Sequence, residues 1–145
     1  MLADNLKVLL ASTFSYYIKT SFFHWNLTGI NFPQYHKLFN KIYEDAQEAI
    51  DTIAEEIRTL DSHAPGSLSR FQELSIIEDQ TQIPRLPLMI EELLYDTEKM
   101  IDLINQCFES ATAENKQDIA NFMAERLSQH QKYRWQLKSC LETEE

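Results

Sequence analysis

Residues 21–60 read SFFHWNLTGINFPQYHKLFNKIYEDAQEAIDTIAEEIRTL and join the end of one predicted helix to the whole of the next. Gly29 is typical of the position just past a helix end, and Pro33 suits the first turn of a helix, where its missing N–H breaks no hydrogen bond. After this turn, apolar residues recur every three or four positions as far as Leu60, the period of an amphipathic helix. The stretch therefore predicts a helical hairpin that turns near Ile30.

The same periodicity predicts the other helices of the chain. A first helix covers residues 4–28 with Asp4 as its N-cap, a third begins after residues 84–87, and a fourth begins at about Ala113. Residues 61–66 break the pattern with a Pro-Gly pair, and a short extra helix follows at residues 67–74, inside the long connection between helices two and three. We therefore predict an all-α fold, a ferritin-like four-helix bundle in up-down-down-up order.

Composition and charge narrow the functional class. The 145 residues suit one domain, residues 1–145, and two glycines and four prolines are too few for a turn-rich β protein. A net charge of −10 disfavours direct nucleic-acid binding, because phosphate contacts need clustered basic residues and these are spread singly. Cys107 and Cys140 cannot make a disulfide framework, so we expect a reducing cytoplasm, with neither a signal peptide nor a membrane span.

Four potential metal ligands lie in the hairpin. Residues equally far from a hairpin turn face one another, so His24 and His36, centred on Ile30, are expected side by side. Asp51 and Glu55 are neighbours at i, i+4 spacing. Because Asp51 follows His36 by fifteen residues, or about 22 Å along a helix, the two pairs cannot bind one ion within a single chain.

A two-fold axis would bring the two pairs together. If the second helices of two copies pack antiparallel with the axis near Glu44–Asp45, the histidines of one copy meet Asp51 and Glu55 of the partner subunit. Two imidazoles and two carboxylates suit Fe(II), with Zn(II) and Mn(II) as competitors. Simpler roles also exist for each residue alone, since a histidine at a helix end commonly packs and an acidic i, i+4 pair commonly faces solvent.

Other candidate residues receive simpler interpretations. His63 and His130 are expected at the surface or as caps, and Trp25 and Trp135 in the core or at an interface. Ferritins bind two irons inside one bundle through Glu-x-x-His on two helices, and no glutamate here is followed by histidine three residues later. The sequence therefore disfavours a metal site within the monomer.

The motif HWN-x-x-G-x-NF at residues 24–32, followed by His36 and by D-x-x-A-E at Asp51–Glu55, resembles the Dps family of ferritin-like DNA-protection-during-starvation proteins. This resemblance covers nearly the whole chain. It implies a hollow dodecamer with ferroxidase sites at two-fold interfaces, where His24 and His36 of one subunit and Asp51 and Glu55 of its mate bind iron. It also implies that Trp25 intercepts radicals beside the iron.

By the same resemblance, the protein would oxidise Fe(II) with hydrogen peroxide or dioxygen, store the ferric mineral and protect against oxidative damage. Family members often carry a carboxylate four residues after the second histidine, where this chain has Asn40, so a second iron is expected to bind weakly or through a bridging water. The chain also lacks the lysine-rich tail typical of members that bind DNA. Two alternatives remain open: a structural adaptor bundle in which the four residues never meet, and a DNA-compacting protein with an unrecognised basic surface.

Overall fold

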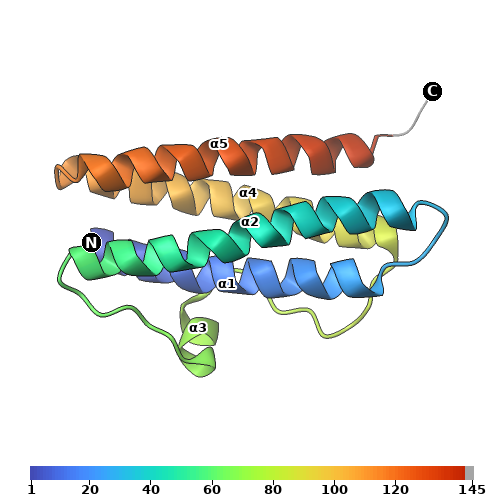
Figure 1. Cartoon of the computed structure of the whole chain (residues 1–145), viewed down its shortest axis with the longest axis horizontal. Helices are drawn as coiled ribbons and strands as arrows, with labels where there is room; N and C mark the ends of the chain where they lie inside the picture. The colour runs from blue at the N-terminus through green and yellow to red at the C-terminus, as the bar shows by residue number, and fades with distance from the viewer. Residues whose placement is uncertain (143–145) are drawn as a thin grey trace.

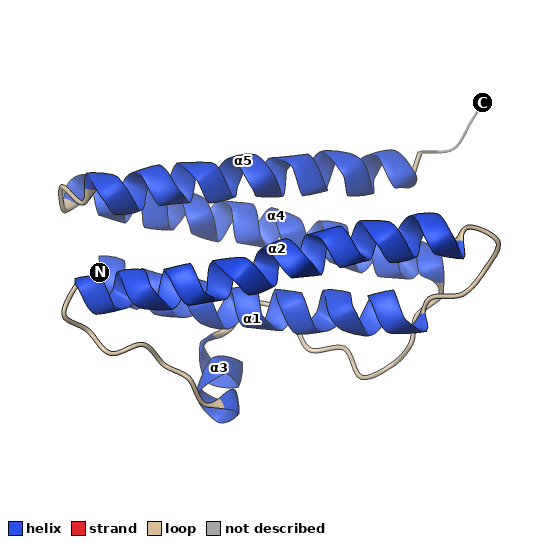
Figure 2. Ribbon diagram, viewed as in Figure 1, coloured by secondary structure: helices blue, strands red, loops and turns tan. Residues whose placement is uncertain are grey.

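Four long helices and one short helix make up residues 1–142, the part of the chain that the computed structural model describes. The bounds of these helices are α1 Leu2–Asn26, α2 Phe32–Thr59, α3 Leu68–Leu74, α4 Leu86–Ala113 and α5 Gln117–Cys140. In Figure 1, α1 and α5 run in one direction and α2 and α4 in the other, so the up-down-down-up order is confirmed. Figure 2 shows the crossover and α3 lying below α1, outside the four-helix bundle.

The first helix ends at Asn26 rather than at residue 28, and two predicted helix starts were wrong for local reasons. The first helix begins at Leu2 rather than Asp4, because the Glu114 carboxylate from the end of α4 accepts a hydrogen bond from the Leu2 N–H at 2.9 Å. The last helix begins at Gln117 rather than near Ala113. The α4 helix runs on to Ala113, and Asn115, with φ of 59°, then makes the left-handed turn between the helices.

The hairpin turn matches its sequence signals. Asn31 is the N-cap of α2 and Pro33 lies in its first turn. Gly29 has φ of +127°, a backbone conformation that side chains disfavour. This turn holds the end of α1 against the beginning of α2 and sets the register of the hairpin.

The bundle core follows the helical period of the sequence. The buried residues of α2 are Phe39, Ile42, Ala46, Ala49, Ile53 and Ile57, spaced by threes and fours. Cys107 is fully buried among apolar residues, as expected for a thiol that acts as a small hydrophobe. Four apolar residues that follow the helical period, Ile18, Leu88, Phe108 and Trp135, are instead exposed in the single chain.

Polar side chains occupy the middle of the bundle. Arg126 donates two hydrogen bonds to Asp45, at 3.0 and 2.8 Å, and its guanidinium lies 3.2 Å from Nε2 of His130. His130 is only 1% exposed, so its predicted surface position was wrong: the residue continues the buried face of α5 and accepts a hydrogen bond from Arg126. The Arg126–Asp45 salt bridge therefore joins α5 to α2 across the bundle.

No helix among residues 1–142 is long and apolar enough to cross a membrane.

Candidate metal centre

His24 and His36 meet beside the turn of the α1–α2 hairpin. His24 belongs to the last turn of α1 and His36 to the second turn of α2. Their imidazole rings stack with centroids 3.6 Å apart and planes inclined by 18°. The structure thus brings together the two histidines that the spacing about Ile30 predicted to be adjacent.

Two reciprocal hydrogen bonds orient these rings. Nδ1 of His24 donates to the backbone carbonyl of His36 at 2.6 Å, and Nδ1 of His36 donates to the carbonyl of His24 at 2.9 Å. A carbonyl oxygen only accepts, so each Nδ1 carries a proton, and in the neutral form of the ring Nε2 is the unprotonated nitrogen. Each Nε2 then keeps its lone pair, which is the arrangement of a histidine ready to ligate a metal.

Burial favours the neutral form of His24. Its side chain is 6% exposed, and loss of hydration lowers its pKa, an effect that the hydrogen bond to His36 partly opposes. His36 is half-buried. A neutral imidazole is the form that binds a metal ion, so metal and proton do not compete for Nε2 of His24 at neutral pH.

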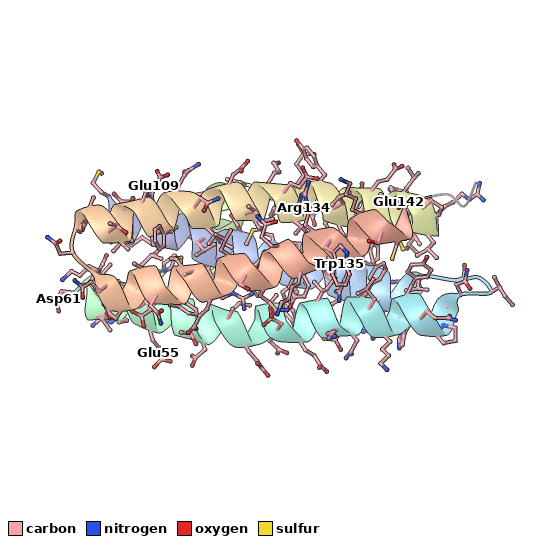
Figure 3. The ribbon with its side chains drawn as sticks, turned by 90° about the horizontal axis from the view of Figure 1, so that it is seen from above. Glu55, Asp61, Glu109, Arg134, Trp135 and Glu142 are labelled. Carbon is pink, nitrogen blue, oxygen red and sulfur yellow. The ribbon has the colours of Figure 1, made fainter. Side chains whose placement is uncertain are left out.

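The acidic pair is placed very differently. Asp51 and Glu55 are both exposed on α2, and Figure 3 shows Glu55 extending away from the bundle. A side-chain hydrogen bond with Asp51, together with its like charge, raises the pKa of Glu55. Two carboxyl groups that repel each other at the surface gain stability from a bound cation.

The structure keeps the histidine pair and the acidic pair apart within one chain. Both pairs lie on α2, which is one continuous helix, so about 22 Å separates His36 from Asp51. Within residues 1–142, no group of three or more histidine, cysteine, aspartate or glutamate side chains is placed to hold a metal ion. One chain therefore holds the four predicted ligands as two separate pairs, His24 with His36 and Asp51 with Glu55.

Two further aromatic rings contact the histidine pair, and one of them, Tyr43, was not predicted from the sequence. Phe32 stacks on His36 with ring centroids 4.7 Å apart, and Tyr43 meets His24 edge to face at 5.0 Å. Tyr43 follows His36 by seven residues, or two helical turns, and this spacing was the signal that could have identified it. Trp25 is 69% exposed and, in the part of the chain described, makes no aromatic contact with either histidine.

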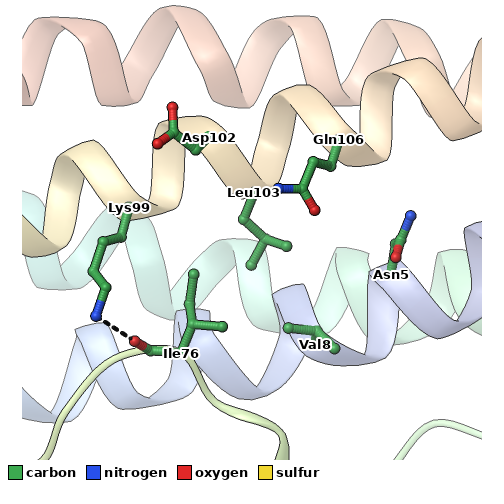
Figure 4. A pocket seen from close by; sticks show the side chains of 7 residues that line it. All are labelled: Asn5, Val8, Ile76, Lys99, Asp102, Leu103 and Gln106. Carbon is green, nitrogen blue, oxygen red and sulfur yellow. Dashed lines mark hydrogen bonds between the residues drawn. The ribbon is translucent and has the colours of Figure 1, made fainter.

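A separate pocket of about 260 Å³ lies between α1, α4 and the crossover, as Figure 4 shows. Lys99 borders this pocket, but its ammonium already donates to the Ile76 carbonyl at 2.9 Å. Val8, another lining residue, precedes His24 by sixteen residues along α1, about 24 Å. The pocket is therefore remote from the histidine pair.

Known proteins resemble this chain over nearly its whole length, in sequence and in structure. The sequence of residues 3–145 matches the protein-family model of the ferritin-like domain. An uncharacterized low-temperature-induced protein of Nostoc sp. is 30% identical over 135 residues, 92% of this chain and 75% of that protein. The crystal structure of Dps from Staphylococcus aureus has a TM-score of 0.95 at 25% identity, covering 99% of this chain and 96% of that one.

The crystal structure of a Dps protein from Vibrio cholerae O1 has a TM-score of 0.93 at 27% identity and covers 97% of this chain and 89% of that one. It is described as a member of a broad superfamily of ferritin-like diiron-carboxylate proteins. Both structural neighbours thus share the helical bundle over almost their full length.

Proposed function

This chain belongs to the Dps family of ferritin-like proteins, and we propose from that membership that it is a ferroxidase that stores iron. Fe(II) is the substrate, hydrogen peroxide or dioxygen the oxidant, and a ferric mineral inside a hollow homododecamer the product. The observation that carries the proposal is the reciprocal hydrogen bonding of His24 and His36, which leaves two Nε2 lone pairs at one end of the hairpin. Buried imidazoles with committed Nδ1 protons are typical of metal ligands.

The remaining ligands come from a second subunit in this proposal. Asp51 and Glu55 of the partner subunit complete the shell when two α2 helices pack antiparallel about an axis near Glu44–Asp45. The exposed acidic pair then supplies the negative charge that attracts Fe(II), and the histidines supply nitrogen ligands that tolerate both iron oxidation states. Zn(II) and Mn(II) compete for the same set.

Exposed apolar side chains support an assembled protein. Large apolar residues that are exposed in the single chain include Ile18, Trp25, Phe32, Leu68 and Trp135. Contact with other subunits would remove these side chains from water, and burial of apolar surface favours association. We propose that these residues are buried between subunits of the cage.

A mixing experiment tests whether the site is shared. One chain carries His24→Ala and His36→Ala, and the other carries Asp51→Asn and Glu55→Gln. Each variant alone is expected to oxidise Fe(II) slowly while still assembling. When equal amounts of the two variants are refolded together, half of the two-fold pairs contain one chain of each kind. Each mixed pair regains one of its two sites, so about a quarter of the wild-type activity is expected to return.

The matched control is His63→Ala, which removes an exposed histidine from the crossover loop and is expected to keep full activity. Sedimentation of each preparation checks that the particle size is unchanged. If mixing restores no activity while both variants assemble, the ligands act within one chain, contrary to the proposal. If both single preparations oxidise Fe(II) at the wild-type rate, these four residues are not the ferroxidase ligands.

A further inference from the structure

Tyr43 connects the histidine pair to a second tyrosine. Its ring lies edge to face against His24, with centroids 5.0 Å apart and planes inclined by 64°. On α1, the Tyr17 ring lies 6.1 Å from the Tyr43 ring. Tyr43 and Tyr17 are both half-buried, so this pair of phenols lies partly shielded from water behind a predicted iron ligand.

The electron requirement of the oxidant gives this contact a role. Hydrogen peroxide takes up two electrons when it is reduced to water, whereas one Fe(II) gives only one. Two imidazoles and two carboxylates are enough ligands for a single ion, and the residue one turn beyond His36 is the neutral amide Asn40. A site that holds one Fe(II) must therefore find a second electron elsewhere or release a hydroxyl radical.

We propose that Tyr43 supplies this second electron, an inference that rests on the proposed ferroxidase function. One Fe(II), one tyrosine phenol, one hydrogen peroxide and one proton give one Fe(III), one neutral tyrosyl radical and two waters. The O–O bond of the peroxide breaks, and the phenol O–H bond breaks to give an electron and a proton. The electron reaches the site through the ring contact with His24, and both protons end in the two waters.

The structure favours Tyr43 over Trp25 for this step. Trp25, which the family resemblance suggested as the radical acceptor, is 69% exposed, and among the described residues its indole makes no ring contact with His24 or His36. Tyr43 contacts His24 directly. Its neighbour Tyr17 offers a second oxidisable ring to which the radical can pass.

The test uses the assembled protein, loaded anaerobically with one Fe(II) per site, mixed with one equivalent of hydrogen peroxide and freeze-quenched for electron paramagnetic resonance. The wild-type protein is expected to give a tyrosyl radical signal whose splitting changes when ring-deuterated tyrosine is incorporated. Tyr43→Phe keeps the ring that contacts His24 but removes the O–H group. This variant is expected to lose the signal and to yield more spin-trapped hydroxyl radical, while Fe(III) still forms.

The control variant is Tyr95→Phe, which alters an exposed tyrosine on α4, and it is expected to keep the signal. An unchanged tyrosyl signal in Tyr43→Phe overturns the inference, as does a tryptophanyl signal that only Trp25→Phe removes. If the wild-type protein forms no Fe(III) with peroxide at all, the proposed function and this inference fall together. If it forms Fe(III) with no radical that depends on Tyr43, only the inference falls.

Discussion

Single hydrogen bonds decide which ring nitrogen of each of these histidines carries a proton. His24 and His36 each give the Nδ1 proton to a backbone carbonyl, which leaves Nε2 open. His130 has the same tautomer, but its Nε2 is already occupied. Its Nε2 accepts from the Arg126 guanidinium, which always donates, so the Nδ1 atom of a neutral ring carries the proton. The same residue type is therefore prepared for ligation at the hairpin end and for core packing in the bundle.

Because His130 is buried, we expect the protein to lose stability as the pH falls. Burial, followed by the charge of Arg126, lowers its pKa to about 3, while Asp45 opposes the shift. The unfolded chain, with a histidine pKa near 6.5, binds more protons than the native one between about pH 6.5 and pH 3. The contribution of His130 to the free energy of unfolding is complete above pH 6.5. It is lost as the pH falls, by up to about 1.4 kcal/mol per pH unit.

Urea unfolding at a series of pH values measures this effect. His130→Gln offers Arg126 an uncharged acceptor that does not titrate, so the free energy of unfolding should fall less steeply below pH 6.5 than in the wild-type protein. Asp45, whose pKa Arg126 holds below its usual range against the effect of burial, also loses stabilising charge as pH falls, but it is present in both chains. Equal slopes in the two proteins would contradict the assignment to His130.

At the scale of elements, the buried Lys19 holds the long crossover against the bundle. Lys19 on α1 forms an ion pair with Asp96 on α4 at 2.8 Å and also donates to the Glu78 carbonyl of the crossover at 3.2 Å. Both side chains of the pair are nearly buried. The crossover is therefore joined to α1 and α4 by charged groups as well as by the apolar contact of Phe71 with Phe14.

Removing one member of this ion pair should destabilise the bundle. Lys19→Met leaves Asp96 buried without its counter-charge, which typically costs about 3–5 kcal/mol. Adding Asp96→Asn should recover part of that loss, because the unpaired charge is then gone. Glu73→Gln, in the exposed Arg70–Glu73 pair, is the control and should change the free energy of unfolding by about 1 kcal/mol or less. Equal losses for Lys19→Met and Glu73→Gln in urea unfolding would show that burial of the pair has no energetic weight.

At the scale of the whole molecule, charge governs what the proposed cage attracts. Each chain carries a net charge of −10, and assembly concentrates this charge on one particle. Cations such as Fe(II) are drawn toward such a surface, whereas the phosphates of nucleic acid are repelled. Protection of DNA by this protein would then be chemical, through removal of iron and peroxide.

A gel shift with plasmid checks the charge argument. At about 0.15 M salt the assembled protein is expected to leave plasmid mobility unchanged, because few basic groups can replace condensed counterions. Sedimentation of the same sample should give a particle of about twelve chains. Retardation of the plasmid would instead support the DNA-compacting alternative, and a monomer or simple dimer would support the adaptor bundle.

The helical hairpin was predictable from sequence because turn signals and apolar period are local properties. Gly29, Asn31 and Pro33 mark the turn, and equal spacing about Ile30 brings His24 and His36 together. The separation of Asp51 from His36 follows from the rise of a helix alone. These positions are enough to divide the four predicted ligands into two separate pairs without knowledge of the tertiary structure.

Other features depended on how separate helices pack, which period alone does not specify. The sequence placed His130 at the surface, yet packing of α5 against α2 puts it beside the Arg126–Asp45 pair. Packing between α1 and α2 likewise determines that Tyr43, and not Trp25, contacts His24. A helical period says which residues share a face, but only the relative rotation and offset of two helices decide which side chains of one face meet those of the other.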